Sequence, residues 1–240
     1  MWRDNLRGIY YIALKDMRTY YLKPPAISWG IVFPVAWILA FYLRNPGNFE
    51  ELVPGLVAMT ILFSTTASEA VVINFEMRIG ALERLLLAPI DVSAVLVGKV
   101  LGGTIFGLLM TAVVTTASVL GLGLQINFFH LLLIVVSSLL VFSSLGALLS
   151  VSVKEVFEAQ TLANIPRFLM MFVSGVFYPI SAMPQVLQHV AYLLPLTYTV
   201  DGLRRVFSGG NAVLIDSLVL TAFFIVFIFP ATRLLQRRFV

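Results

Sequence analysis

One short segment in the first half of the chain combines charged side chains with regularly spaced leucines. Leu82, Leu85 and Leu86 recur at i, i+3 and i+4, which predicts a short helix with one apolar face. Glu83 and Arg84 are neighbours, so they point in different directions and do not pair with each other. Such a helix is suited to docking, because an apolar helix face commonly inserts into a groove of a partner protein. A surface elbow that only joins two longer helices is the alternative.

The rest of the sequence offers no residues arranged for catalysis. It contains no GxxxxGK[ST] phosphate-binding loop, no HExxH zinc motif and no GxSxG nucleophile motif. The absence of cysteine excludes disulfides and thiolate chemistry. His130 and His189 are isolated from other ligand-type residues, so we predict no metal site. We expect neither enzymatic activity nor a bound cofactor in this chain.

The composition identifies the solvent in which the chain folds. Of its 240 residues, 60% are hydrophobic and only 12% are charged, and the mean hydropathy is +0.97. A typical soluble domain is about 45–50% apolar and about 25% charged. One water-facing domain could not bury this much apolar surface, so a soluble enzyme, a disordered chain and a disulfide-rich scaffold are poor interpretations. The composition instead predicts an all-α membrane protein that crosses the bilayer several times.

The pattern along the chain predicts six transmembrane helices and several accessory segments. A basic amphipathic helix at the N-terminus is expected to lie in the membrane interface and to end at Pro24 and Pro25. The apolar but proline-broken stretch before the last span is expected to form short re-entrant helices. The predicted order within a single transmembrane domain, residues 1–240, is an interface helix (1–25), spans 1 and 2 (26–75), a cytoplasmic coupling helix (76–91), spans 3 and 4 (97–151), span 5 (161–178), an external re-entrant segment (179–211), span 6 (212–232) and a cytoplasmic tail (233–240).

Basic residues are distributed unevenly between the two predicted sides of the membrane. Thirteen of the sixteen Lys and Arg residues lie in or beside segments on the side of the two termini. Arg44, Arg204 and Arg205 lie on the other side. Because short cytoplasmic loops are enriched in basic residues, both termini are predicted in the cytoplasm of a cell that holds the protein in its plasma or inner membrane. This asymmetry also accounts for the net charge of +4 without a nucleic-acid partner.

A few charged residues fall inside or beside the predicted spans. A charge at the bilayer centre costs about 2.5–3.5 kcal/mol, so Glu69 in span 2 either lies near the cytoplasmic interface or lines a path. Arg167 is expected to extend to the cytoplasmic surface. Asp201, Arg204 and Arg205 have the spacing of an ion pair at the external interface, with a role in gating or headgroup binding as the alternative. Small residues that permit close helix packing occur in span 3: Gly98, Gly102, Gly103 and Gly107.

Two motifs resemble those of the ABC type-2 transporter permeases, the membrane subunits of ATP-binding-cassette exporters. The pattern E-x-R-x-G-x-L-E-R-L-L-x-x-P, from Glu76 to Pro89, is similar to the cytoplasmic signature of this family. The segment from Leu194 to Arg205 resembles the pattern N-P-L-T-Y-x-x-x-x-x-R before the last span, with leucine where the family usually has asparagine. The resemblance covers essentially the whole chain.

The resemblance implies a permease that exports a drug, lipid or polysaccharide as a homodimer within the membrane lipid. It implies a separate ATPase subunit that uses ATP with Mg, and leucines of the coupling helix buried in the contact with that subunit. The implied ATPase-coupling residues are Glu76, Arg78, Gly80, Leu82, Glu83, Arg84, Leu85, Leu86 and Pro89. The implied residues of the external gate or re-entrant segment are Pro195, Leu196, Thr197, Tyr198, Asp201, Arg204 and Arg205, and Glu69 is a candidate path-lining residue.

Two other functions compete with this interpretation. An ion-coupled secondary transporter or channel that acts without an ATPase would carry charges in several spans, whereas here Glu69 stands nearly alone and Arg167 lies near a span end. A membrane assembly factor without transport activity would need no ATPase either. Co-purification with an ATPase separates these alternatives from the permease.

Overall fold

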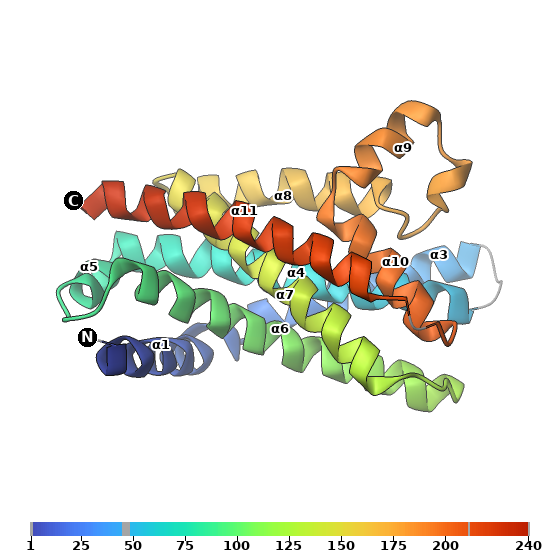
Figure 1. Ribbon diagram of the computed structural model, residues 1–240, viewed down its shortest axis with the longest axis horizontal. Helices are drawn as coiled ribbons and strands as arrows, with labels where there is room; N and C mark the ends of the chain where they lie inside the picture. The colour runs from blue at the N-terminus through green and yellow to red at the C-terminus, as the bar shows by residue number, and fades with distance from the viewer. Residues whose placement is uncertain (1, 45–48, 211, 240) are drawn as a thin grey trace.

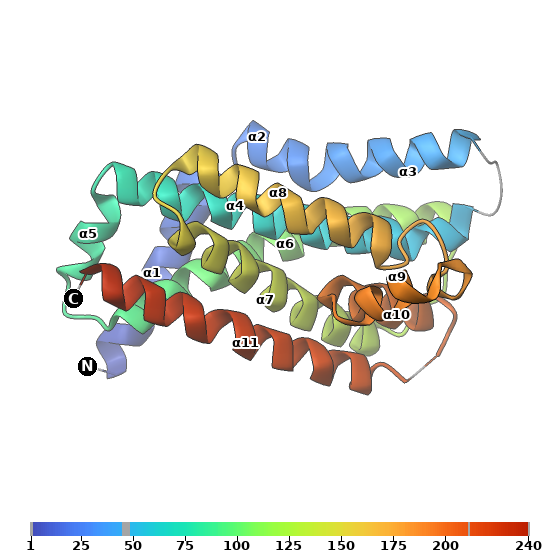
Figure 2. The same ribbon diagram turned by 90° about the horizontal axis from the view of Figure 1, so that it is seen from above.

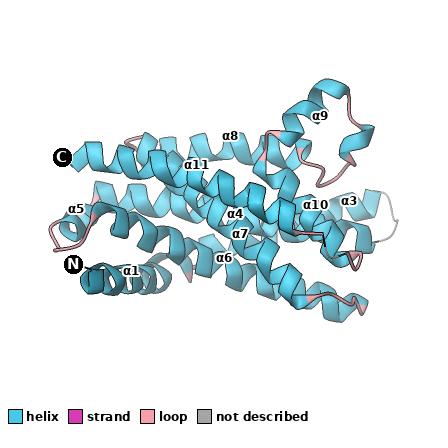
Figure 3. Cartoon of the chain, viewed as in Figure 1, coloured by secondary structure: helices cyan, strands magenta, loops and turns pink. Residues whose placement is uncertain are grey.

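The computed structural model describes residues 2–44, 49–210 and 212–239, and in this part of the chain every regular element is a helix (Figure 3). In chain order the elements are α1 (Trp2–Asp16), the π-helix η1 (Met17–Tyr21), α2 (Pro24–Ile27), the π-helix η2 (Ser28–Val32), α3 (Phe33–Arg44), the 3-10 helix η3 (Phe49–Leu52), α4 (Val53–Arg78), α5 (Ala81–Leu86), α6 (Val92–Leu122), α7 (Phe128–Ser152), α8 (Val156–Val173), the 3-10 helix η4 (Ile180–Ala182), α9 (Gln185–Tyr192), α10 (Pro195–Phe207) and α11 (Leu214–Phe239).

Within the described residues, four helices are long and apolar enough to cross a membrane. They are Phe49–Arg78, Val92–Leu122, Phe128–Ser152 and Leu214–Arg237. This confirms an all-helical membrane protein but not the predicted count of six spans. The helix Ser28–Leu43 is shorter, and α8 carries Glu158, Gln160 and Arg167 within its 18 residues. Both nevertheless run beside the long helices in Figure 2.

Helix α4 forms the centre of the bundle. In its most apolar 18-residue stretch, 94% of the residues are buried. In the corresponding stretch of α11 only 22% are buried, so α11 lies at the periphery. Three threonines in α4 are fully buried, and each hydroxyl donates to the carbonyl one turn earlier: Thr60 to Leu56, Thr65 to Ile61 and Thr66 to Leu62. The helix backbone thus satisfies these polar groups, which allows α4 to pack on all sides.

The two ends of the bundle carry different elements. Helix α1, helix α5 and both chain termini lie at one end, while α3, α9 and α10 end at the other (Figure 1). Figure 2 shows α1 lying across the long axis of the bundle. The segments predicted to share one side of the membrane are therefore together in space.

Several predicted boundaries shift. The N-terminal α-helix ends at Asp16 and continues as a π-helix to Tyr21, before the two prolines. The α-helix of predicted span 5 ends at Val173, and Gly175 has a left-handed φ of +82°. The predicted re-entrant segment consists of η4, α9 and α10, of which α9 stands away from the bundle (Figure 1). Residues 45–48, between predicted spans 1 and 2, lie outside the described residues. Residue 211, the last of the predicted re-entrant segment, lies outside them as well.

Candidate functional site

The predicted coupling segment is a tight reversal between two spans. Helix α4 continues to Arg78, and Gly80 then adopts a left-handed φ of +68° that lets α5 begin at Ala81. Glycine reaches this conformation without steric cost, unlike residues with a Cβ atom. The coupling helix therefore has six residues, fewer than the segment 76–91 suggested.

The leucines of α5 face the chain's own core. Leu82 is fully buried and belongs to an apolar cluster that includes Ile73 and Val95, and Leu85 and Leu86 pack partly buried against the same cluster. We expected these leucines to be buried in the contact with a partner. The structure corrects this for Leu82, because the single apolar face of so short a helix is already covered by α4 and α6.

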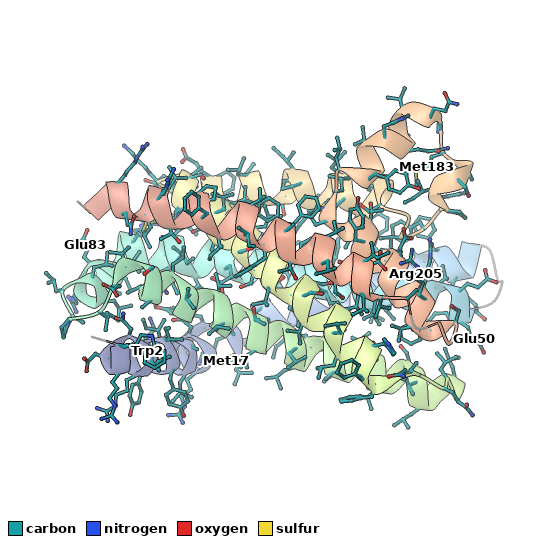
Figure 4. The ribbon with its side chains drawn as sticks, in the orientation of Figure 1. Trp2, Met17, Glu50, Glu83, Met183 and Arg205 are labelled. Atoms are coloured by element: carbon teal, nitrogen blue, oxygen red, sulfur yellow. The ribbon has the colours of Figure 1, made fainter. Side chains whose placement is uncertain are left out.

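A different set of side chains is free for a partner. The side chain of Leu87 is 87% exposed, directly after α5. Glu83 projects at the end of the molecule in Figure 4, and the other exposed members of the segment are Arg78, Ile79, Arg84, Ala88, Pro89 and Asp91. This exposed set contains both charged and apolar side chains, and all of them are accessible to another molecule.

Glu76 lies inside the protein, in a cluster of four charged residues. Its carboxylate accepts hydrogen bonds from Lys15 of α1 and Lys99 of α6. Asp16 pairs with the same two lysines, at 2.9 Å from Lys15 Nζ and 3.1 Å from Lys99 Nζ. Asp16, Glu76 and Lys99 are fully buried, and the two cations balance the two carboxylates. Glu76, predicted to couple to the ATPase, therefore faces helices of its own chain.

The α1 members of this cluster have shifted pKa values. Burial alone would lower the pKa of the Lys15 ammonium, but Asp16 and Glu76 more than offset this effect and raise it above the ordinary lysine value. Burial raises the pKa of the Asp16 carboxyl, and the neighbouring Lys99 opposes that rise. The lysine thus stays charged in its paired position.

Glu69 lies deeper in α4 and is also enclosed. The Tyr21 hydroxyl donates a 2.7 Å hydrogen bond to Glu69 Oε1, and the Ser143 hydroxyl lies 3.4 Å from the same oxygen. The Glu69 side chain fits here because Gly103 and Gly146 have no Cβ atoms. A Cβ atom at Gly146 would lie 2.9 Å from Glu69 Cβ, and one at Gly103 would overlap the carboxylate. Since Glu69 is 0% exposed, its carboxylate faces the chain's own helices rather than an opening.

Arg167 does not extend to the surface as expected. Its side chain is fully buried, its Nε donates to the Ala163 carbonyl at 3.0 Å, and its guanidinium lies 5.6 Å from the centre of the Phe63 ring. Packing of α8 on α4 holds it in place.

The second motif forms α10 at the other end of the bundle. Pro195 begins the helix, Leu196 and Thr197 are buried, and the Tyr198 hydroxyl donates to the Tyr192 carbonyl. The expected ion pair of Asp201 with its arginines is not formed. Arg205 pairs with Asp216 of α11 instead, and Arg204 donates to the Gly175 carbonyl.

A cavity opens beside these arginines. It has a volume of about 560 Å³, and its lining includes Glu50, Glu51, Phe177, Arg204 and Arg205. Figure 4 shows Glu50 and Arg205 at this end, opposite Glu83. Among the described residues, no three His, Asp or Glu side chains are grouped closely enough to hold a metal ion.

These features define the class of protein: a helical membrane protein with a short exposed turn between two long helices at one end of the bundle. The sequence comparisons identify the family. Residues 7–208 match the ABC-2 type transporter family, so the chain belongs to it. The protein is thus a transport permease of the ABC transporter class, and the resemblance found in its two motifs is confirmed.

Named relatives agree with this assignment. The chain is 27% identical to the inner membrane transport permease YadH of Escherichia coli strain K12, over 95% of this chain and 96% of that protein. It is 28% identical to the "Probable multidrug ABC transporter permease YbhS" of the same strain, over 74% of this chain and 48% of that protein. It is 26% identical to nodulation protein J of Rhizobium meliloti strain 1021, over 99% and 92% of the two chains.

Proposed function

We propose that this chain is the permease subunit of an ATP-driven exporter, that it forms the transmembrane path as a homodimer, and that a separate ABC ATPase drives it. The observation that carries the proposal is the exposed α4–α5 turn at the end of the bundle that also holds both termini (Figure 1). The sequence contains no nucleotide-binding loop, so ATP-driven motion would have to come from a separate ATPase. Such motion is transmitted through a contact surface of this kind. Family membership supports the same interpretation.

We also propose that the membrane is crossed six times. The continuous helical rod Pro24–Arg44 and the 18 residues of α8 are about 31 Å and 27 Å long, close to the thickness of the hydrocarbon core. The low hydropathy of α8 does not argue against a span, because Arg167 points into the protein while Ile165 and Leu169 are exposed. We further propose that the end with α1, α5 and the termini faces the cytoplasm, which the excess of basic residues at this end supports.

The proposed mechanism starts at the docking turn, which we define as residues 78–89 between the end of α4 and the start of α6. ATP binding closes two ATPase subunits on each other, and the turn moves with them because Glu83, Arg84 and Leu87 are in contact with the partner. The turn is continuous with α4 and leads into α6, so its displacement shifts two central helices. The path between the two protomers then opens toward the cavity beside Arg204 and Arg205. Each nucleotide state must favour one of the two arrangements for this to work.

The substrate class is a drug, lipid or polysaccharide. One relative is named as a multidrug permease and another as a nodulation protein, and we take these names only as guides to which substrates to test. A screen for compounds that change ATP turnover of the reconstituted complex will identify the substrate.

The test removes the exposed charges of the turn. Glu83→Ala with Arg84→Ala should insert normally into the membrane, yet should lower both co-purification of the ATPase and its stimulation by the permease at least tenfold. The matched control is Gln185→Ala with His189→Ala, two exposed polar residues of α9 at the other end that do not line the cavity there, which should change neither. Full activity of the first variant would reject the docking role. Transport by the purified chain alone, driven by an ion gradient, would reject the permease proposal in favour of a secondary transporter.

A further inference from the structure

Helix α1 contacts the segment between α5 and α6, and the helices α4 and α6, at several points. Its Asn5 side chain donates to the Asp91 carboxylate and accepts from the Asp91 backbone N–H at 3.0 Å. A Cβ atom on Gly8 would lie 3.1 Å from the side chain of Ile90. Ile90 and Asp91 are the last two residues before α6, so α1 touches the chain directly after the docking turn.

The next contacts along α1 are to the first turns of α6. Gly98 and Gly102 have no side chains there, and Cβ atoms at these positions would lie 3.1 Å from Ile12 Cβ and 3.4 Å from Ala13 Cα. The two helices therefore touch closely over two turns. Ile12 and Ala13 are 3% and 5% exposed, which shows that this is the buried face of α1.

The charged cluster joins α1 to both helices that flank the turn. Lys99 belongs to α6 and Glu76 to the end of α4, and both contact residues of α1. If α1 separated from these helices, the buried carboxylates of Asp16 and Glu76 would each lose one of their two lysine partners. Unpaired buried charges are strongly unfavourable, so the cluster opposes separation.

A last contact lies beyond Asp16. Tyr21, at the end of η1, is bonded to Glu69 in the middle of α4 and stacks on Phe106 of α6 with ring centres 5.4 Å apart. The chain then passes through Pro24 into the helical rod of the first predicted span. Displacement of α1 would therefore reach that span.

We propose that Lys15, Asp16, Glu76 and Lys99 are positioning residues that make α1 and the docking turn move as one unit, so that motion imposed on α5 by the ATPase is transmitted through α1 to the first span. This inference rests on the proposed function. It gives α1 a mechanical role in addition to its location at the membrane interface. The exposed outer face, with Trp2, Arg3 and Tyr10, remains free for lipid.

The test fixes α1 to α6 covalently. The chain contains no cysteine, so Ile12→Cys with Gly98→Cys introduces a unique pair. A Cβ atom at position 98 would lie 3.1 Å from Ile12 Cβ, so a shift of a few tenths of an ångström brings the pair to disulfide geometry. The variant is reconstituted in liposomes with the partner ATPase, and ATP turnover is measured with Mg-ATP before and after oxidation. We expect the oxidised complex to retain at least half of the turnover of the reduced complex. A tenfold loss on oxidation that is reversed by reductant would overturn the inference, as would failure of the pair to cross-link.

A second variant separates transmission from folding. Lys99→Gln in the cysteine-pair background should lower stimulation of the ATPase at least fivefold when reduced, and oxidation should restore it because the disulfide replaces the ion pairs. Loss of stimulation that oxidation does not restore would mean that Lys99 serves only the fold, and would overturn the role in transmission.

The two proposals fail in different ways. If the reduced cysteine-pair variant stimulates the ATPase but the oxidised variant does not, only the single-unit inference is wrong. If the unmodified chain neither binds nor stimulates an ATPase, the proposed function is wrong.

Discussion

Leu82 and Leu87 lie five positions apart in the docking segment, and the structure assigns them opposite roles. Leu82 is 0% exposed and packs inside the chain, whereas Leu87 is 87% exposed. Leu82→Ala should destabilise the protein by about 2–5 kcal/mol, the range for a buried leucine that leaves a cavity. Leu87→Ala should change stability by no more than about 0.5 kcal/mol, as for a surface position.

The two variants should also differ in their affinity for the ATPase. Burial of one leucine side chain contributes about 1.5–3 kcal/mol, so loss of Leu87 from the contact should raise the Kd about 10- to 150-fold. Leu82→Ala should leave the Kd nearly unchanged under conditions in which the variant is folded. Thermal unfolding in detergent measures the first quantity, and titration of the detergent-solubilised permease with the ATPase measures the second.

The opposite pattern would refute this assignment. If Leu87→Ala unfolded more readily while Leu82→Ala bound the ATPase more weakly, then Leu82 would be the docking residue and α5 would turn over on binding. Equal Kd values for both variants and the unmodified chain would remove the leucines from the contact altogether.

Three further predictions follow from single positions. Leu87→Cys should react with a membrane-impermeant maleimide only from the cytoplasmic side, and the 75% exposed Val186→Cys only from the outside; labelling of both from one side would contradict the topology. Gly103→Ala should destabilise by about 1–3 kcal/mol because its Cβ would overlap the Glu69 carboxylate, whereas Gly121→Ala, with nothing within 4 Å, should be neutral in the same melting assay. Tyr21→Phe should cost about 1–3 kcal/mol in that assay, since it removes a hydrogen bond to a buried carboxylate, and an unchanged midpoint would mean that Glu69 finds another donor.

The sequence was informative where the signal is local. The spacing of the leucines placed a helix in the docking segment, and Gly80 lies where the chain reverses between α4 and α5. An apolar helix face predicts burial, however, but not the surface that buries it. This is why Leu82 was expected in a contact with another protein and was found within its own.

Contacts between distant segments could not be read from the sequence. Lys99 and Asp16 are separated by 83 positions, and hydropathy does not show that they meet beside Glu76. The spacing of Asp201 with Arg204 and Arg205 predicted an ion pair within one helix, and this prediction was wrong. Arg205 instead pairs with Asp216, because the start of α11 brings a second carboxylate alongside α10.

The inward orientation of the embedded charges bears on how a path could form. Glu69, Glu76, Lys99 and Arg167 are all 0% exposed and are held by groups of the same chain. A path for ions through one chain requires polar groups along a wet opening, and these side chains do not provide one. The exposed surface of α3 and α6, by contrast, is apolar, with Val35, Leu39 and Leu109 among its members. A path built between two copies of the chain, opened by movement of whole helices, is therefore easier to reconcile with this structure than a pore lined by its charged residues.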